Sequence, residues 1–185
     1  MPLSSRRGPG DRMGLPGAQR GNREGVRQVA DRVDRETRHR IMKSNRSRDT
    51  GPELEVRRAL FARGFRYRLG GRGLPGKPDL VLPKHRAVVF VHGCYWHGHE
   101  CTRSPRSRSN REYWESKVER NRNRDDRNVK SLLGLGWRVL VIWECAIRRR
   151  NPPFGESAAL DHVISWLQGA GKLGILSENG FEEHL

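Results

Sequence analysis

Two apolar stretches decide the fold: Ala87-Val88-Val89-Phe90-Val91 and Trp137-Arg138-Val139-Leu140-Val141-Ile142-Trp143. Both are short and rich in β-branched residues, which is typical of strands buried on both faces of a sheet. A shorter apolar run, Asp79–Leu82, comes before the first stretch and is separated from it by the turn Pro83–Arg86. We therefore expect a sheet with these segments at its centre.

Helix signals flank the strands. Thr50 can cap a helix, Pro52 suits its first turn, and Glu53 lies at capping-box distance. Gly64 marks the end of that helix. The remaining predicted elements are a strand at 65–69, helices at 36–45, 110–133 and 158–167, and irregular chain at 93–109.

This order of elements predicts one small α/β domain, a mixed sheet covered by helices. The 185 residues are enough to bury a core. Residues 1–33 are rich in Gly, Pro and Arg without apolar periodicity, so we expect a disordered basic extension. The domain proper would span 34–150, and 151–185 would add a helix and a short acidic tail packed on it.

Charge points to a polyanionic partner. Lys and Arg number 37 against 21 Asp and Glu, a net charge of +16. The excess lies mainly in residues 31–150, which favours a nucleic-acid surface over a basic tail alone. The alternative is a solubilising surface. No run of about 18 apolar residues and no secretory signal is present, so we expect no membrane span and a cytoplasmic protein.

The segment His92-Gly-Cys94-Tyr-Trp-His97-Gly-His99-Glu-Cys101 concentrates soft metal ligands. An odd number of cysteines without a secretory signal argues against disulfides. With Cys145, which follows the second apolar strand, these residues offer the three Cys and one His of a structural zinc site. Spacing leaves His97 and His99 open as the fourth ligand. Three free thiols, or a catalytic zinc, are the alternatives.

Carboxylates and aromatic residues complete the candidate site. Asp79 opens a strand whose neighbour ends at Val91-His92, and Glu53 and Asp125 are further acids. Hard oxygen ligands near a phosphate path favour Mg²⁺-dependent cleavage over binding alone. The aromatic residues of this basic region could stack on bases or cover the zinc site. They are Tyr95, Trp96 and Trp114.

Three motifs together resemble one family. They are Leu74-Pro-Gly-Lys-Pro-Asp79, Val88-Val-Phe-Val-His92-Gly-Cys94-Tyr-Trp-His97-Gly-His99-Glu-Cys101 and Gly136-Trp-Arg-Val-Leu-Val-Ile-Trp-Glu-Cys145. This combination is similar to the very-short-patch-repair (Vsr) DNA mismatch endonucleases, over about residues 34–150. The resemblance implies a restriction-endonuclease-like fold and Mg²⁺-dependent nicking of duplex DNA 5′ of the thymine in T:G mismatches left by 5-methylcytosine deamination. A monomer suffices for one nick, and mismatch-repair proteins are possible partners.

The resemblance also implies a role for each site residue. Asp79 and the Val91 carbonyl would bind Mg²⁺, and His97, oriented by Glu53, would act as general base. His92 and Asp125 would hold hydrated metal and phosphate. Zinc would take Cys94, His99, Cys101 and Cys145, and the DNA wedge would be Tyr95, Trp96 and Trp114.

Three positions depart from the family pattern, and two other hypotheses for the function stay open. Val91 stands where Thr is familiar, Tyr95 where Phe is familiar, and Gly98 replaces a histidine. The alternatives are a restriction-type nuclease without mismatch preference, and a non-catalytic, zinc-stabilised DNA-binding module. Retention of Asp79, His92 and His97 together favours the enzyme, because a binding module does not need that trio.

Overall fold

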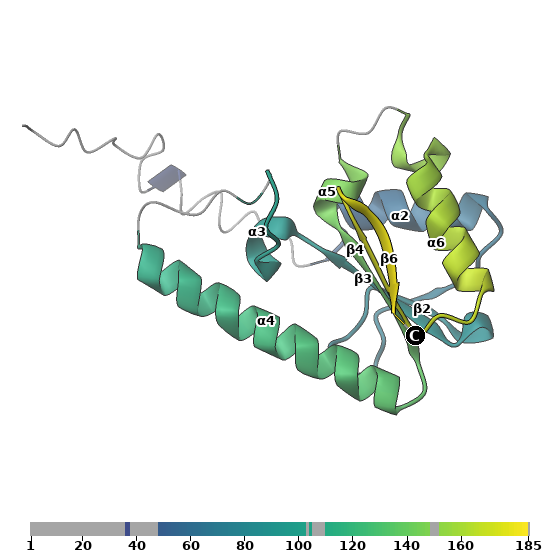
Figure 1. Ribbon diagram of the computed structural model, residues 1–185, viewed down its shortest axis with the longest axis horizontal. Coiled ribbons are helices and arrows are strands. Elements are labelled where there is room, and N and C mark those ends of the chain that lie inside the picture. The colour runs from purple at the N-terminus through teal and green to yellow at the C-terminus, as the bar shows by residue number, and fades with distance from the viewer. Residues whose placement is uncertain (1–35, 38–47, 103, 105–109, 149–151, 185) are drawn as a thin grey trace, which may run out of the picture. The chain divides into compact units, whose positions relative to one another are not determined.

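A six-stranded mixed sheet organises the computed structural model (Figure 1). The structure describes residues 36–37, 48–102, 104, 110–148 and 152–184. These belong to one compact unit, 33–185. The predicted extension 1–33, and the predicted helix 36–45 apart from Glu36 and Thr37, lie outside the described residues.

The sheet has the strand order β1-β2-β3-β4-β5-β6. Its two central pairings, β3 with β4 and β4 with β5, are parallel, and the outer pairings are antiparallel. The mixed sheet predicted from the sequence is therefore confirmed, with the two apolar stretches side by side at its centre. The strands are β1 (Arg68–Leu69), β2 (Leu80–Leu82), β3 (Ala87–His92), β4 (Arg138–Trp143), β5 (Leu173–Ser177) and β6 (Gly180–His184).

One face of the sheet carries the larger core, beneath α2 (Gly51–Ala62) and α6 (Ala158–Gln168). Alternate residues of the central strands, such as Val89, Leu140 and Ile142, point into this core because successive side chains of a strand face opposite sides. The Thr50 hydroxyl accepts from the Glu53 N–H, so the predicted start of α2 is confirmed. Two short turns, α5 (Glu144–Ile147) and η2 (Phe154–Glu156), connect β4 to α6 on this face.

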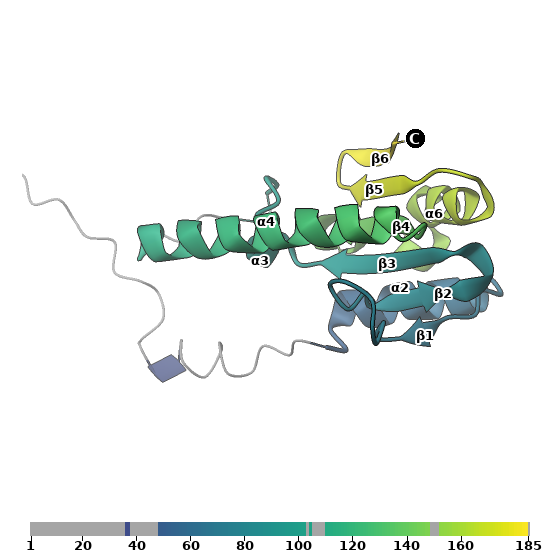
Figure 2. The same ribbon diagram turned by 90° about the horizontal axis from the view of Figure 1, so that it is seen from below.

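The other face is covered by the long helix α4 (Arg111–Gly134). Only the end of α4 packs on the sheet, where Leu132 joins Val88 and Val141 in a smaller core. The first half of α4 extends past the strand ends and lies beside α3 (Cys94–His97) (Figures 1 and 2). This overhang brings the middle of α4 to the carboxyl end of β3.

Three local predictions were wrong. Residues 93–109 include the short helix α3, and the predicted strand 65–69 shrinks to β1. The acidic tail forms β5 and β6, which complete the sheet at one edge. β5 lies in the sheet because it pairs with β4 over Val139–Ile142, a contact that local sequence does not show.

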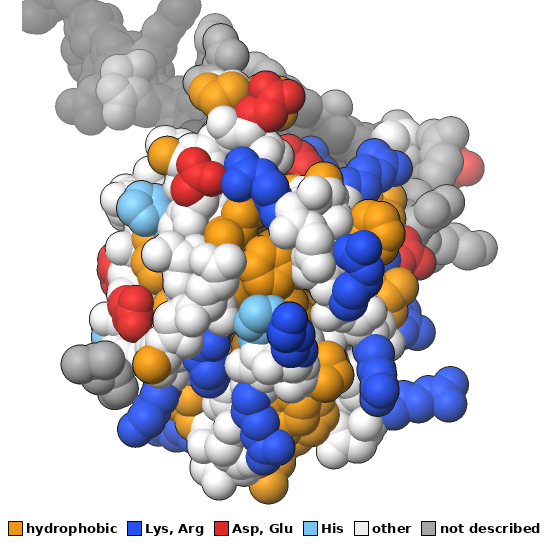
Figure 3. Space-filling model, turned by 90° about the vertical axis from the view of Figure 1, so that its right-hand side faces the viewer, with side chains coloured by type: hydrophobic (Ala, Val, Ile, Leu, Met, Phe, Trp, Pro, Cys, Tyr) orange, Lys and Arg blue, Asp and Glu red, His pale blue; other side chains and the backbone are white. Residues whose placement is uncertain are grey.

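Basic side chains are dispersed over the face shown in Figure 3, among polar and apolar ones. On that face the charge is distributed as expected for the alternative interpretation given above, a solubilising surface. Among the helices that the structure describes, none has both the length and the apolar character of a membrane span.

Candidate active site and metal centre

The segment that follows β3 supplies three separate side-chain clusters. His92 ends β3, α3 begins at Cys94, and Gly98 ends α3 in the left-handed conformation at φ +69°. Because this chain turns so sharply, neighbouring residues point to different places. The Cys/His cluster is Cys94, His99, Cys101 and Cys145, the His/Asp cluster is His92, His97 and Asp125, and the aromatic cluster is Tyr95, Trp96 and Trp114.

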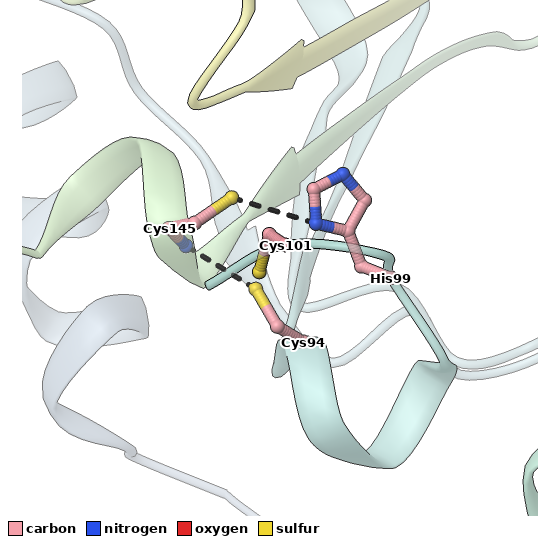
Figure 4. Close-up of side chains that lie close together, drawn as sticks. All are labelled: Cys94, His99, Cys101 and Cys145. Atoms are coloured by element: carbon pink, nitrogen blue, oxygen red, sulfur yellow. Dashed lines mark hydrogen bonds between the residues drawn. The ribbon is translucent and has the colours of Figure 1, made fainter. Parts of the chain in front are cut away.

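The four residues of the Cys/His cluster point toward one another (Figure 4). Their ligand atoms all lie within 4.8 Å of one another. The Cys145 Sγ is 3.6 Å from His99 Nδ1, and the Cys145 N–H donates to Cys94 Sγ at 3.3 Å. The cluster thus joins the loop after β3 to the end of β4.

This donor set fits zinc. Ligands of tetrahedral zinc stand about 3.5–3.8 Å apart, given bonds of about 2.1 Å to nitrogen and 2.3 Å to sulfur. The distance from sulfur to nitrogen observed here matches that spacing. Burial raises the pKa of the Cys94 and Cys145 thiols, an effect that a bound cation would reverse. The cluster could therefore hold a metal ion, and its histidine is His99.

The His/Asp cluster is built from β3, α3 and α4. His97 Nδ1 and Asp125 Oδ2 are 2.5 Å apart, and the rings of His92 and His97 stack with centroids 4.0 Å apart. Burial lowers the pKa of His92 to about 3, so this imidazole is neutral at physiological pH. For Asp125 burial opposes ionisation, but the hydrogen bond and charge of His97 outweigh it and lower the pKa.

The pairing with Asp125 fixes the orientation of the His97 ring. When Nδ1 donates to a carboxylate, Nε2 keeps its lone pair and can accept a proton. His97 is partly exposed, with 21% of its side chain open to solvent, so a water molecule can reach it. The arrangement therefore has the chemistry of an oriented general base.

Asp79 lies next to Val91 at the same end of the sheet. Its Oδ2 accepts the Val91 N–H at 2.8 Å, which fixes the carboxylate beside the last residues of β3. Burial, helped by the charge of Glu53 and opposed by the hydrogen bond from Val91, raises the pKa of Asp79 to about 6. A partly buried carboxylate within the electrostatic influence of a second acid is a suitable place for a hard divalent cation.

Glu53 does not orient His97 as the resemblance implied. The hydrogen bond of His97 goes to Asp125, whereas the Glu53 carboxylate is bound at the start of α2. It accepts from the Asp49 N–H at 2.9 Å and from Arg57 Nη2 at 2.9 Å. Together with the Thr50 hydroxyl, which donates to Glu53 Oε1, these partners hold the carboxylate at the start of α2, and this explains the difference.

The aromatic cluster lies on the overhanging part of α4 and on α3. Trp96 and Trp114 have ring centroids 5.8 Å apart, and Tyr95 contacts both at 5.1 and 5.6 Å. All three residues are partly exposed. The sequence left two roles open, a cover over the metal centre and a DNA wedge, and the partial exposure is compatible with either.

Sequence reasoning missed several residues around these clusters. Lys117 Nζ lies 5.1 Å from the Trp114 ring and 5.6 Å from the Trp96 ring, and Asn121 Nδ2 donates to the Trp96 carbonyl at 2.8 Å. Positions 114, 117, 121 and 125 follow helical spacing, so they share one face of α4. This helical spacing is the signal in the sequence that places Lys117 and Asn121 beside Trp114 and Asp125.

A partly buried carboxylate and a carboxylate-paired histidine on a basic α/β domain define a candidate phosphodiester-cleaving enzyme. The family model of DNA mismatch endonuclease Vsr matches residues 30–103. The Escherichia coli DNA mismatch endonuclease Vsr is 37% identical over 143 residues, 77% of this chain and 91% of that protein. This chain therefore belongs to the Vsr family and is a DNA endonuclease.

Nicking enzymes are also among its relatives. The type II nicking enzyme V.XorIIP of Xanthomonas oryzae pv. oryzae is 45% identical over 119 residues, 64% of this chain and 88% of that protein. V.NmeAIP of Neisseria meningitidis is 42% identical over 110 residues, 60% of this chain and 79% of that protein. These relatives support the nicking of DNA.

Proposed function

We propose that this protein nicks duplex DNA on the 5′ side of the thymine in a T:G mismatch, as a Mg²⁺-dependent enzyme of very short patch repair. The observation that carries the proposal is the placement of Asp79 and the Asp125-paired His97 at one end of the sheet. One relative bears the name DNA mismatch endonuclease, and other relatives are named nicking enzymes.

Two metal ions would have separate places. Asp79 and the Val91 carbonyl would hold Mg²⁺, and the Cys/His cluster would hold a structural Zn²⁺. The Val91 side chain has no hydroxyl, so only its backbone can serve. Bound Mg²⁺ would stabilise the negative charge that develops on the phosphoryl oxygens.

His97 would activate the attacking water. Asp125 holds Nδ1, so Nε2 takes the water proton as the oxygen attacks phosphorus and one P–O bond of the backbone breaks. The buried His92 stacks on the His97 ring and limits its rotation. His92 and Asp125 would also face the hydrated metal and phosphate, and Glu53 would remain the second acid facing Asp79.

The aromatic cluster would enter the DNA beside the mismatch. A mismatched step is easier to unstack than a paired one, so a wedge turns deformability into selectivity. Tyr95, Trp96 and Trp114 are partly exposed and lie together at the overhanging end, where an incoming duplex could reach them. Lys117 adds a positive charge against their rings.

The substrate also suggests where the protein works. Mismatches from 5-methylcytosine deamination arise in chromosomal DNA, so the proposed activity belongs in the cytoplasm at the nucleoid, with mismatch-repair proteins as possible partners. One strand is cut, which one site on a monomer can achieve.

A strand-resolved nicking assay tests the proposal. One labelled duplex carries a single T:G mismatch in a methyltransferase-type site and the control carries C:G, each with Mg²⁺ or with a chelator. A Mg²⁺-dependent nick only in the T strand supports the proposal. Asp125→Asn should lower the rate about 10²- to 10⁴-fold, since it removes the carboxylate that fixes the His97 tautomer.

Two other outcomes would identify other functions. Equal cutting of both duplexes would leave a nicking enzyme without mismatch preference; several relatives are named nicking enzymes. Steeply salt-dependent binding without any product would indicate a binding module.

A further inference from the structure

We infer that one side of α4 holds the sugar–phosphate backbone of the DNA duplex and supplies the part of the binding that does not depend on base sequence. The residues of this basic flank are Lys117, Arg120, Arg124 and Arg127. The inference rests on the proposed function, in which the aromatic cluster selects the mismatch, and it assigns the affinity for any duplex to a different set of residues.

Helical spacing sorts the charges of α4 into two rows. Successive members of the basic flank are three, four and three residues apart, so they form one row along the helix, and no acidic residue of α4 falls in it. The exposed acids of α4 have the same kind of spacing and form a second row. They are Glu112, Glu115, Glu119 and Asp126.

The second row is electrically compensated. It also carries Arg111 and Arg122, whose guanidinium groups lie near acids. Arg111 Nε is 2.6 Å from Glu115 Oε1, and Arg122 Nη2 is 3.8 Å from Glu100 Oε1. A phosphate backbone therefore finds little net attraction on this side of α4.

The basic flank lacks this compensation. Arg120 and Arg127 are exposed, and among the described residues no acid pairs with either of them. Like charges at neighbouring helical positions, such as Arg120 and Arg124, destabilise a helix. A polyanion that lies along such a row removes this repulsion, so the row fits the phosphates of DNA.

The basic flank runs beside the clusters of the candidate active site. At one end Lys117 Nζ lies 5.1 Å from the Trp114 ring, in the aromatic cluster. Further along, Arg124 Nη2 lies 3.2 Å from Asp125 Oδ1, in the His/Asp cluster. A backbone held along this row therefore passes both the proposed wedge and the proposed general base.

The same flank leads to the loop before Asp79. A Cβ on Gly76 would lie 2.8 Å from Asn128 Nδ2, so this loop lies against α4 next to Arg127. Lys77, exposed in the loop, places another positive charge two residues before Asp79. The positive charge thus extends from α4 toward the proposed Mg²⁺ site.

The length of the row suits a short stretch of one DNA strand. Between Lys117 and Arg127 the helix rises about 15 Å, which is the axial length of about four nucleotides of a strand. The row begins on the part of α4 that extends past the strand ends (Figures 1 and 2). The basic side chains on the face shown in Figure 3 are dispersed instead.

The salt dependence of DNA binding by the full-length protein tests the inference. Fluorescence anisotropy is recorded without Mg²⁺ at several salt concentrations, on the labelled T:G duplex and on the C:G duplex. Arg120→Gln and Arg127→Gln should each reduce the slope of log affinity against log salt by about one, and the double variant by about two. The reduction should be equal on both duplexes because phosphate contacts carry no sequence information.

Two variants control for other causes. Lys130 is exposed in the second row, so Lys130→Gln removes one positive charge from the other side of α4 and should leave the slope unchanged. The double variant Arg120→Lys with Arg127→Lys keeps both charges and should keep the slope of wild type. This pair of controls separates the position of a charge from the net charge and from any change in the helix.

The outcomes separate this inference from the proposed function. An unchanged slope in the double glutamine variant would overturn the inference, and so would an equal reduction in Lys130→Gln. Equal binding and equal cutting of the two duplexes would instead discard mismatch selection, while the salt slopes would still decide whether the basic flank holds the backbone.

Discussion

The Cys/His cluster and the His/Asp cluster share one short segment but differ in their donor atoms and in the elements that they join. Two thiols of the first, Cys94 and Cys145, are buried, His99 and Cys101 are partly exposed, and its members join the end of β4 to the loop after β3. The second combines one buried imidazole, His92, with the partly exposed His97 and Asp125. Closed coordination suits a structural metal, whereas a reaction needs a side open to water and substrate.

The comparison shows how a chain can place unlike chemistry within a few residues. After β3 ends, the chain makes one turn of helix and then passes through Gly98 in the left-handed conformation. His97 therefore points toward α4, and His99 points toward Cys145. If the two clusters have separate roles, changes in one should affect activity and changes in the other should affect stability.

The largest effect on the nicking rate is expected at Asp79, in the proposed active site. Asp79→Asn keeps the size of the side chain but removes its charge, so nicking should fall about a thousandfold or more if Asp79 is the carboxylate ligand of Mg²⁺ that we propose. Rates on the mismatched duplex under single-turnover conditions measure the effect. Asp161→Asn, an equivalent change at an exposed acid of α6, should leave the rate unchanged. Similar rates for Asp79→Asn and wild type would exclude Asp79 from the chemistry.

The closed cluster should instead control stability. Cys145→Ser removes a proposed zinc ligand that would tie β4 to the loop, and we expect a loss of at least about 3 kcal/mol and a melting temperature lower by about 10 °C. Thermal unfolding with and without added Zn²⁺ measures it. Thr102→Ala, at an exposed residue next to the proposed ligand Cys101, is the control and should change little. A wild-type protein whose unfolding is insensitive to a zinc chelator would argue against a structural metal.

Much of this arrangement could be predicted from the sequence. The apolar runs of β3 and β4 and the Thr50 cap of α2 are local signals, and the structure has all three. The soft-ligand segment and Cys145 are also visible because so many such residues rarely fall so close together. Resemblance to a family then selected His99 over His97, which spacing alone could not do.

What could not be predicted depends on contacts distant in sequence. β6 carries exposed charged residues, Glu182 and Glu183, and joins the sheet only because it pairs with β5. The partner of His97 lies 28 residues away, so only the register of α4 against α3 selects Asp125 over Glu53. Tertiary contacts of this kind override local preference.

A smaller effect is expected from pH, which should change the affinity for Mg²⁺ at the proposed Asp79 site. Because burial holds the pKa of Asp79 at about 6, against 3.8 for an ordinary aspartate, protons compete with Mg²⁺ below pH 6. The apparent affinity for Mg²⁺ should fall about tenfold for each unit of pH below that value. Calorimetric titration of the protein with Mg²⁺ across this range measures it, and a flat profile would contradict the elevated pKa.

The same shift has a consequence for stability. The native state binds the Asp79 proton more tightly than the unfolded state, so metal-free protein should lose stability as the pH rises from 3.8 to 6. The loss from this group would be at most about 3 kcal/mol. Asp79→Asn should therefore be more stable than wild type at neutral pH, and the difference should vanish in acid.

The smallest expected effect lies between the two clusters, at Gly98. Its φ of +69° is unfavourable for other residues, and a Cβ there would meet Val118 and Arg122 of α4. Gly64 has a similar φ of +87° with open space around it, so Gly64→Ala isolates the conformational cost of about 1 kcal/mol. Gly98→Ala should cost about 1 kcal/mol more, since α4 has to move.

Denaturant unfolding of both glycine variants measures this difference. Arg122 donates to the Gly98 carbonyl, so Arg122→Ala has its own cost, and the double variant shows how much of the Gly98→Ala loss comes from contact with Arg122. A smaller loss for Gly98→Ala in the Arg122→Ala background would indicate that this glycine lets α4 approach closely enough for Asp125 to reach His97. Equal losses for Gly64→Ala and Gly98→Ala would instead mean that α4 yields freely, and that the two clusters do not depend on this close approach.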